Sequence, residues 1–335
     1  MKRISIIIFF IAIAGTIAGA VWYQLASSPP GGDQELKFSI ERGENLKSIS
    51  RRLYESGLIK SKFLFEQYAR WRDLAGRLQA GDYKLNTGQS LSEIAASLLS
   101  AKRESKRVLI KEGETVEEIA KVFADSGLFG AREFLQAAVA DQNLKNRYVF
   151  LSDLPIGATL EGFLFPDTYD FFVGVTPQEA IKKMLDNFSR KVPPEMIETM
   201  KAQGKTLYEI ITLASIVERE VRKPEDMKIA AGIFWSRLGR GQALQSDATL
   251  SYVLNDTEAA HSAADLEINS PYNTYKYPGL PPTPINNPGL NAINAVFQPT
   301  ATKYNFFLTS PDGTVYYAET FEGHVANKVK YLRKK

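Results

Sequence analysis

The sequence contains no cysteine and only two histidines among its 335 residues. Without cysteine there is no disulfide, no thiolate nucleophile and no cysteinyl metal site. Two histidines argue against a protein-built zinc site, so we expect no metal and no cofactor. An excess of charge is also absent, because 41 Lys and Arg balance 38 Asp and Glu to a net charge of +3. This small excess argues against a nucleic-acid partner.

What the chain does contain is typical of a globular protein. Apolar residues make up 44% and charged residues 24% of the sequence, which argues against general disorder and against a membrane protein with many spans. A chain of 335 residues exceeds the size of an ordinary single core, so its length predicts two or three domains.

One long hydrophobic run opens the chain. Residues 4–23 carry no charge, and about 20 residues rising 1.5 Å each in a helix cross the hydrocarbon core of a bilayer. Lys2 and Arg3 precede the run and the next basic residue is Lys37. The positive-inside rule therefore places the N-terminus in the cytoplasm and the rest of the chain outside.

These features predict a transmembrane anchor over residues 1–25, followed by a linker rich in Ser, Pro and Gly over residues 26–35. The alternative is a cleaved signal peptide, whose apolar region is normally shorter, about 7–15 residues. We expect a single-pass protein anchored in the membrane, with its main part on the extracytoplasmic side.

A repeated pattern follows the linker. Residues 38–49 align with residues 108–119, and a shorter third copy covers residues 83–94. Each copy has alternating apolar residues, which predict a short strand, then a glycine, a helix-capping residue and an apolar stripe at helical spacing. We therefore predict strand–helix modules over residues 36–150.

The repeat resembles the LysM module, which binds the glycan chains of peptidoglycan and chitin. Residues 92–95 and 117–120 are the most similar to it. The resemblance implies glycan binding by this region. The alternative is a scaffold that only packs against the next domain, and both interpretations stay open.

The segment 206–221 predicts an amphipathic helix that carries a carboxylate on its apolar face. Thr206 and Glu209 are spaced as a capping box, and an apolar stripe begins at Leu207. At 100° per residue, Glu218 lies about 20° from Leu207, whereas Glu220 points to the opposite side.

A carboxylic acid on a buried helix face must be paired or protonated. Because desolvation raises its pKa toward neutrality, Glu218 is a candidate general acid. The alternative is a structural glutamate that Arg219, Arg222 or a backbone group satisfies.

Polar and aromatic side chains gather in further segments of the C-terminal half, at residues 160–169, 244–252, 270–275 and 278–289. Amides, hydroxyls and tyrosine rings can hydrogen-bond sugar hydroxyls and stack on sugar rings. The alternative is a structural turn and long loops. The candidate substrate-binding residues are Glu161, Gln245, Asp247, Asn273 and Tyr275.

Together these motifs resemble the YceG-like family of endolytic murein transglycosylases. The resemblance is carried in order by segments 160–169, 213–220, 244–247, 272–275 and 279–282. Ala248 and Thr283 stand where the family pattern has Pro and Gly, and neither position carries the chemistry.

The resemblance implies an α+β protein of the bacterial cytoplasmic membrane with a catalytic domain over residues 151–335. Its substrate is peptidoglycan, cut at the β-1,4 bond between N-acetylmuramic acid and N-acetylglucosamine within a strand, to leave a 1,6-anhydro-N-acetylmuramic acid end. The family's catalytic glutamate corresponds to Glu218, as general acid and then base. The resemblance also implies termination of nascent strands, with membrane-bound peptidoglycan synthases as possible partners.

Two alternative functions remain open at the level of sequence. A hydrolytic muramidase needs a second carboxylate, for which Asp247 and Glu161 are candidates. A non-catalytic peptidoglycan-binding protein needs none.

Overall fold

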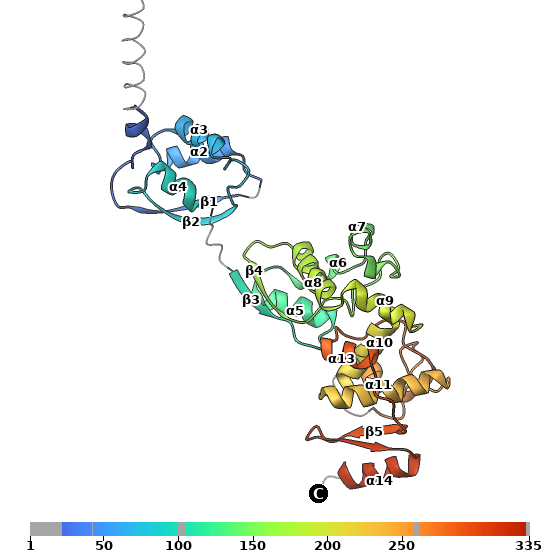
Figure 1. Ribbon diagram of the computed structural model, residues 1–335. Helices are drawn as coiled ribbons and strands as arrows, with labels where there is room; N and C mark the ends of the chain where they lie inside the picture. The colour runs from blue at the N-terminus through green and yellow to red at the C-terminus, as the bar shows by residue number, and fades with distance from the viewer. Residues whose placement is uncertain (1–21, 42, 100–104, 257–260, 333–335) are drawn as a thin grey trace, which may run out of the picture. The chain divides into compact units, whose positions relative to one another are not determined.

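The computed structural model describes residues 22–41, 43–99, 105–256 and 261–332 (Figure 1). The chain divides into two compact units, Met1–Ser105 and Lys106–Lys335, which are described separately below. The predicted anchor, residues 1–25, falls mostly outside the described residues. Within the described ranges, no helix combines the length and the apolar character needed to cross a membrane.

Over its described residues from 35 to 99, the first unit consists of a two-stranded sheet and three helices (Figure 1). In chain order its elements are β1 (Glu35–Ile40), α2 (Leu46–Glu55), α3 (Lys62–Trp71), β2 (Gly81–Asn86) and α4 (Leu91–Ser97). β1 and β2 pair antiparallel, with Phe38 opposite Tyr83. The core of the unit lies between this sheet and the helices, where Leu53, Phe65 and Ile94 are fully buried.

The second unit begins with the same order of elements. β3 (Ser105–Leu109), α5 (Val116–Ser126) and α6 (Ala131–Ala137) are followed, after an insertion, by β4 (Thr168–Phe172), which pairs with β3. The insertion contains α7 (Gln142–Arg147) and the 3-10 helix η1 (Val149–Leu151). Both full copies of the repeat thus form a strand, two helices and a returning strand.

The division into compact units differs from the predicted regions 36–150 and 151–335. Residues 106–150 pack with the C-terminal half, because the partner of β3 is β4 and because Val108 and Phe123 share one core with Leu160 and Val217. The third copy of the repeat, residues 83–94, supplies β2 and α4 of the first unit. It therefore completes a module and does not form one of its own.

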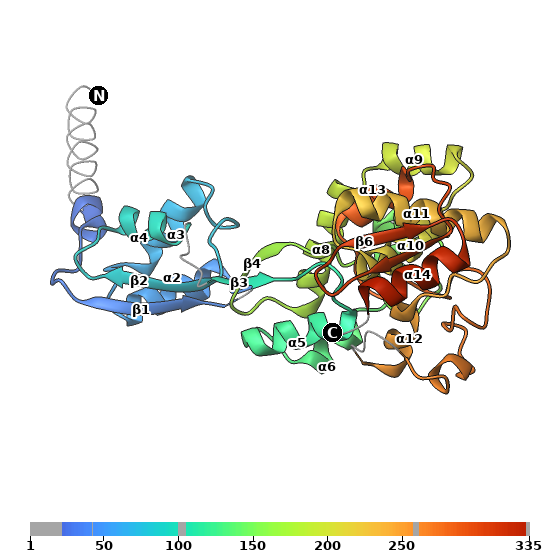
Figure 2. The same ribbon diagram turned by 90° about the horizontal axis from the view of Figure 1, so that it is seen from below.

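The remaining elements of the second unit are mainly helical. They are α8 (Pro177–Lys191), α9 (Pro194–Ala202), α10 (Leu207–Glu220), α11 (Pro224–Gly239), α12 (Asp247–Leu254), η2 (Asp265–Glu267), α13 (Leu290–Phe297), β5 (Phe306–Thr309), β6 (Val315–Ala318) and α14 (Phe321–Tyr331). Helix α14 covers the antiparallel hairpin of β5 and β6 (Figure 2). The mixture of helices with small sheets confirms the predicted α+β class.

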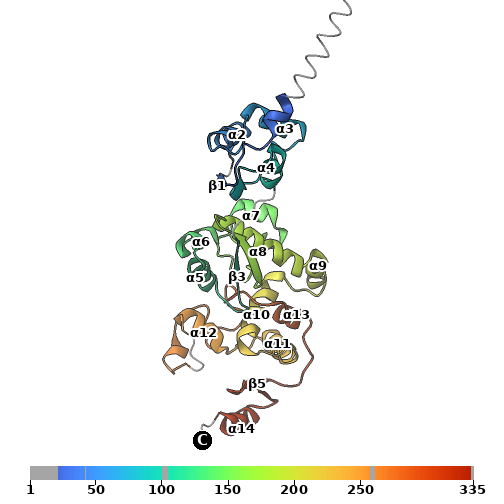
Figure 3. The same cartoon turned by 90° about the vertical axis from the view of Figure 1, so that its left-hand side faces the viewer.

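Helix α10 is the central element of the second unit. It packs against α11 and α13 on one side and against α12 on the other (Figure 3). The predicted capping box at its start is present, since Thr206 accepts from the Glu209 N–H and Glu209 accepts from the Thr206 N–H. The structure buries Leu207 and every residue from 210 to 217, so the helix is enclosed on all sides and not only on its predicted apolar face.

Two glycines of α11 offer a matched test of this packing. A Cβ added at Gly232 would lie 2.3 Å from the carbonyl oxygen of Thr300, whereas at Gly239 it would meet nothing within 4 Å. We expect Gly232→Ala to lower the free energy of unfolding by about 1–3 kcal/mol, because backbone must shift to make room. Gly239→Ala should be neutral or stabilising by up to about 1 kcal/mol. Urea titrations of both variants check this, and equal effects would contradict it.

Candidate active site

Glu218 lies in the last turn of α10, between two glycines. Its Oε2 accepts a hydrogen bond of 2.9 Å from the backbone N–H of Gly289, the residue that caps the start of α13. On another side, a Cβ added at Gly113 would be 3.5 Å from Cγ of Glu218. The glycine turn of the second repeat copy and the start of α13 therefore both border this carboxylate.

The surroundings of Glu218 adjust its proton affinity. Burial raises the pKa of its carboxyl to about 7, with a further rise from the negative charge of Glu112, while the Gly289 N–H lowers it. A carboxyl with this pKa is substantially protonated at neutral pH and still able to release its proton. This is the property that a general acid requires.

The loop that carries Gly289 is buried from residue 284 to residue 289. Ser215 of α10 holds it on one side: its Oγ accepts from the Ile285 N–H at 3.0 Å, and its carbonyl accepts from Asn286 Nδ2 at 2.6 Å. These bonds explain how a loop rich in Pro and Asn is fixed without regular structure.

Asn287 ties the same loop to the repeat. Its N–H and its Nδ2 both donate to the carbonyl of Glu114 at 3.0 Å, and its own carbonyl accepts from the Gly113 N–H at 2.9 Å. Its Oδ1 accepts from the Leu164 N–H at 2.9 Å. The loop before α13 and the glycine turn before α5 are thus held as one wall beside Glu218.

Glu161 belongs to this framework. Only 4% of the residue is exposed. Both carboxylate oxygens accept from the Val116 N–H at 3.1 Å, and Oε1 also accepts from Asn287 Nδ2 at 2.9 Å. Burial raises its pKa to about 8, against the lowering effect of the Val116 N–H. The carboxylate of Glu161 is therefore hydrogen-bonded to protein groups at the start of α5. The sequence had predicted a contact with substrate for this residue.

Asn273 is likewise enclosed, with none of its surface exposed. Its Nδ2 donates to the carbonyls of Leu266 and Ile268, and its Oδ1 accepts from the Tyr275 N–H. Because both ends of the amide are occupied within the loop, Asn273 supports this loop, and its contact with substrate stays a prediction.

A second group of ionisable side chains surrounds Glu220, on the α12 side of the helix. Ser246 Oγ donates to Glu220 Oε1 at 2.5 Å, and Tyr275 OH donates to Asp247 Oδ1 at 2.6 Å. Burial raises the pKa of Glu220 to about 7 against the lowering effects of Ser246 and Arg237, and the charge of Asp247 raises it further. Glu220 points away from Glu218, as predicted. Its burial was missed, because only the folded chain brings α12 over it.

Gln245 lies beside this group, exposed and in the left-handed backbone region with φ of 54°. It borders a hollow of about 500 Å³ together with Arg237, Arg240 and Asn305. The structure thus brings Gln245, Asp247 and Tyr275 together near Glu220. Glu161 lies in the wall beside Glu218, which the loop before α13 and the glycine turn before α5 form. Asn273 lies in the loop that carries Tyr275.

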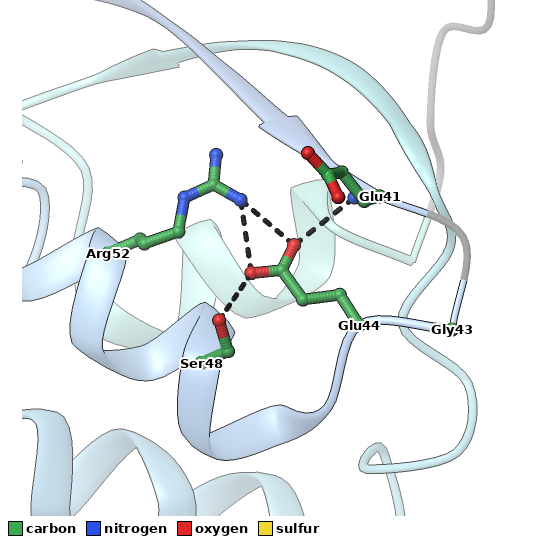
Figure 4. A pocket seen from close by; sticks show the side chains of 5 residues that line it. All are labelled: Glu41, Gly43, Glu44, Ser48 and Arg52. Carbon is green, nitrogen blue, oxygen red and sulfur yellow. Dashed lines mark hydrogen bonds and ion pairs between the residues drawn. The ribbon is translucent and has the colours of Figure 1, made fainter.

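The first unit has a hollow at the matching turn of its own repeat copy (Figure 4). Glu44 accepts there from Arg52 Nη1 at 3.0 and 2.9 Å, from Ser48 Oγ at 2.7 Å and from the Glu41 N–H at 3.1 Å. In the second copy Glu114 accepts in the same way from the Lys111 N–H at 3.2 Å. The two turns are therefore alike in structure, with φ of 82° at Gly43 and 79° at Gly113. Glycan binding by these modules stays a prediction.

The comparisons with known proteins agree with this arrangement. Residues 38–330 match the family model described as the YceG-like family. The chain belongs to the YceG-like family. It resembles the endolytic murein transglycosylase of Streptococcus pneumoniae serotype 2 (strain D39 / NCTC 7466), with 32% identity over 98% of this chain and 65% of that protein. Its identity to the enzyme of the same name from Bacillus subtilis (strain 168) is 30%, over 90% of this chain and 86% of that protein.

A solved structure shows the same family fold. The crystal structure of the yceG-like protein lmo1499 from Listeria monocytogenes matches 88% of this chain and 99% of that chain, with a TM-score of 0.61 and 26% identity. This YceG-like chain spans about two thirds (65%) of the length of its streptococcal relative.

The raised pKa of Glu161 predicts a pH dependence of stability. A carboxyl whose pKa is about 8 in the folded chain and near 4.3 when unfolded holds its proton more tightly in the folded state. Stability is therefore lost as pH rises between these values, with a slope of at most about 1.4 kcal/mol per pH unit.

Glu161→Gln cannot ionise, so we expect its free energy of unfolding to fall less steeply between about pH 5 and about pH 8. Glu195→Gln, an exposed position on α9, should keep the slope of the unmodified chain. Urea titrations across this range measure both slopes. The same slope in all three proteins would show that Glu161 is not neutralised by burial.

Proposed function

We propose that this chain is an endolytic murein transglycosylase. Its substrate is the glycan strand of peptidoglycan, cut at the β-1,4 bond between N-acetylmuramic acid and N-acetylglucosamine to leave a 1,6-anhydro-N-acetylmuramic acid end. The observation that carries the proposal is the half-buried Glu218 with a pKa raised to about 7. The names of the streptococcal and Bacillus relatives support the same activity.

The reaction needs only one carboxyl group. Protonated Glu218 donates its proton to the glycosidic oxygen as the bond from that oxygen to C1 of the muramic acid breaks. The resulting carboxylate takes the proton of the 6-hydroxyl while O6 bonds to C1, which restores the acid. Because the nucleophile belongs to the same sugar, its effective concentration is high and no water has to be positioned.

The Gly289 N–H has a direct part in this cycle. It donates to Oε2 of Glu218, and a hydrogen bond to an ionised carboxylate is stronger than one to the neutral acid. The donor therefore stabilises the carboxylate formed after the first proton transfer. Burial favours the protonated form at the start, so the two effects act on different steps.

Glu220 is the other glutamate of α10 with a pKa raised to about 7, and its position suits catalysis less well. Its oxygen is bonded to Ser246, within a network of Asp247, Tyr275 and Arg237. Glu218 is bordered on one side by Gly113, which has no side chain to cover it. We therefore assign the acid to Glu218, and support of α12 to Glu220.

The hydrolytic alternative has less support from the geometry. A muramidase would need a second carboxylate facing the same sugar. Glu161 is buried and bonded to backbone, and Asp247 is bonded to Tyr275 on the Glu220 side of the helix. A role in binding peptidoglycan without cutting it is tested by the product analysis below.

Membrane attachment is part of the proposal. Residues 4–23 carry no charge and follow directly after Lys2 and Arg3. This pattern supports a retained anchor, with the catalytic part on the extracytoplasmic side. An enzyme so anchored would meet new strands where membrane-bound synthases make them, and its cuts would end their elongation.

Replacing the proposed acid tests the activity. We expect Glu218→Gln to lower the yield of anhydro ends by about 100- to 10,000-fold, because the amide cannot donate the proton. Glu198→Gln, an exposed position on α9, should leave the yield unchanged. Mass spectrometry of the products from purified glycan strands measures this. Anhydro ends from Glu218→Gln would exclude the assignment, reducing ends would indicate a hydrolase, and no new ends from the unmodified protein would indicate a binding protein.

The proposal also fixes the direction of the pH dependence. Glu218 must begin protonated, so the rate should decline as pH rises through about 7, the pKa of this carboxyl. Well above that pH each further unit should cost about tenfold. Initial rates of anhydro-end formation across the pH range give this alkaline midpoint. A rate that keeps rising above pH 7 would rule out a carboxylic acid as the donor.

A further inference from the structure

We infer that Glu112 is a positioning carboxylate of this site, which acts through Glu218 and keeps it protonated before the reaction. The inference rests on the proposed function, because it concerns the proton that Glu218 donates. It assigns a role to a residue of the second repeat copy that the spacing of the repeat did not single out.

Glu112 and Glu218 meet at a single residue, Gly289. A Cβ added at Gly289 would lie 2.0 Å from Oε1 and 2.3 Å from Cδ of Glu112, so the Glu112 carboxylate fills the space that a side chain there would occupy. The N–H of the same glycine donates to Oε2 of Glu218 at 2.9 Å. One carboxylate is thus beside the Cα of Gly289 while the other is bonded to its nitrogen.

The backbone next to Glu112 borders Glu218 as well. Gly113 follows directly, and a Cβ there would lie 3.5 Å from Cγ of Glu218. Gly113 is fixed by its N–H bond to the carbonyl of Asn287 and by the bond from Arg219 Nη2 to its own carbonyl, of 2.9 and 3.0 Å. The segment that carries Glu112 is therefore held in place from two sides.

The two carboxylates differ in their access to water. Glu112 is exposed, whereas Glu218 is half-buried. When two carboxyl groups lie close together, the one with less access to water is protonated more readily. The negative charge of the other favours this protonation further. The charge of Glu112 therefore favours the protonated form of Glu218. In agreement with this, burial and then the charge of Glu112 both raise the pKa of Glu218.

The other charged groups around the site are engaged elsewhere. Arg219 donates to the Gly113 carbonyl and pairs with Glu118 at 3.4 Å. Glu161 is bonded to the start of α5, and the carboxylate of Glu114 accepts from the Lys111 N–H. Within the described residues, no ion pair joins a cation to Glu112, so its negative charge is not neutralised beside Glu218.

The turn itself does not require an acid at this position. The first repeat copy has the same glycine turn, and the residue that aligns with Glu112 there is Arg42. Among the described residues of that unit, no helix corresponds to α10. A carboxylate at this position is therefore associated with the copy that borders Glu218.

The pH profile of anhydro-end formation tests this role. We expect Glu112→Gln to move the alkaline midpoint down by about 0.5 pH unit, which is the effect of one solvent-exposed charge a few ångströms from Glu218. The shift should shrink at high salt because the exposed charge is screened. Glu112→Asp keeps the charge and should keep a midpoint close to that of the unmodified protein.

Glu117→Gln is the matched control, since it removes the same charge from an exposed position of α5 and should leave the midpoint unmoved. Glu112→Ser removes the charge with a smaller side chain and should reproduce the shift if Glu112→Gln unfolds. An unmoved midpoint in the folded charge-removing variants would overturn the inference, as would an equal shift in Glu117→Gln. If the unmodified protein makes no anhydro ends, or Glu218→Gln still makes them, the proposed function fails instead.

Discussion

The second unit depends on the meeting of buried and half-buried carboxylates with the starts of helices. Glu161 accepts from Val116 at the start of α5, Glu218 from Gly289 before α13, and Glu220 from Ser246 before α12. The N–H groups at a helix start have no partner within the helix and carry positive partial charge. Glu161 and Glu218 each satisfy such an N–H group, and Glu220 accepts from the hydroxyl of Ser246, the residue before α12, so the three carboxylates fix the segments that lead into these helices.

Each of these contacts also balances two opposing effects on proton affinity. Burial raises the pKa of all three glutamates, to about 8 for Glu161 and about 7 for Glu218 and Glu220, while donors lower it. The same contact therefore orders a loop and keeps an acid near neutrality. In this unit the same contacts of the glutamates support the fold and adjust the proton affinity of the site.

Local patterns predicted the local parts of this structure. The capping box of α10 and the helix face that carries Glu218 each depend on residues close in sequence, and both are present. The pairing of β3 with β4 joins segments about 60 residues apart, so the repeat alone could not show where its second module ends. Glu112, Glu220 and the burial of Glu161 depend on contacts from distant segments, which no spacing along the chain displays.

The pKa of a single carboxyl that donates a proton and then accepts one can be neither too high nor too low. A pKa raised far above neutrality would make the acid hold its proton during bond breaking, and a pKa near the ordinary value would leave it ionised before the reaction. At Glu218, burial and the charge of Glu112 act in one direction and the Gly289 N–H in the other. Because Gly289 contacts both carboxylates, a shift of this one residue would change both sides of the balance together. The buried loop that holds Gly289, through Asn287 and Ser215, is therefore as necessary to the chemistry as the acid itself.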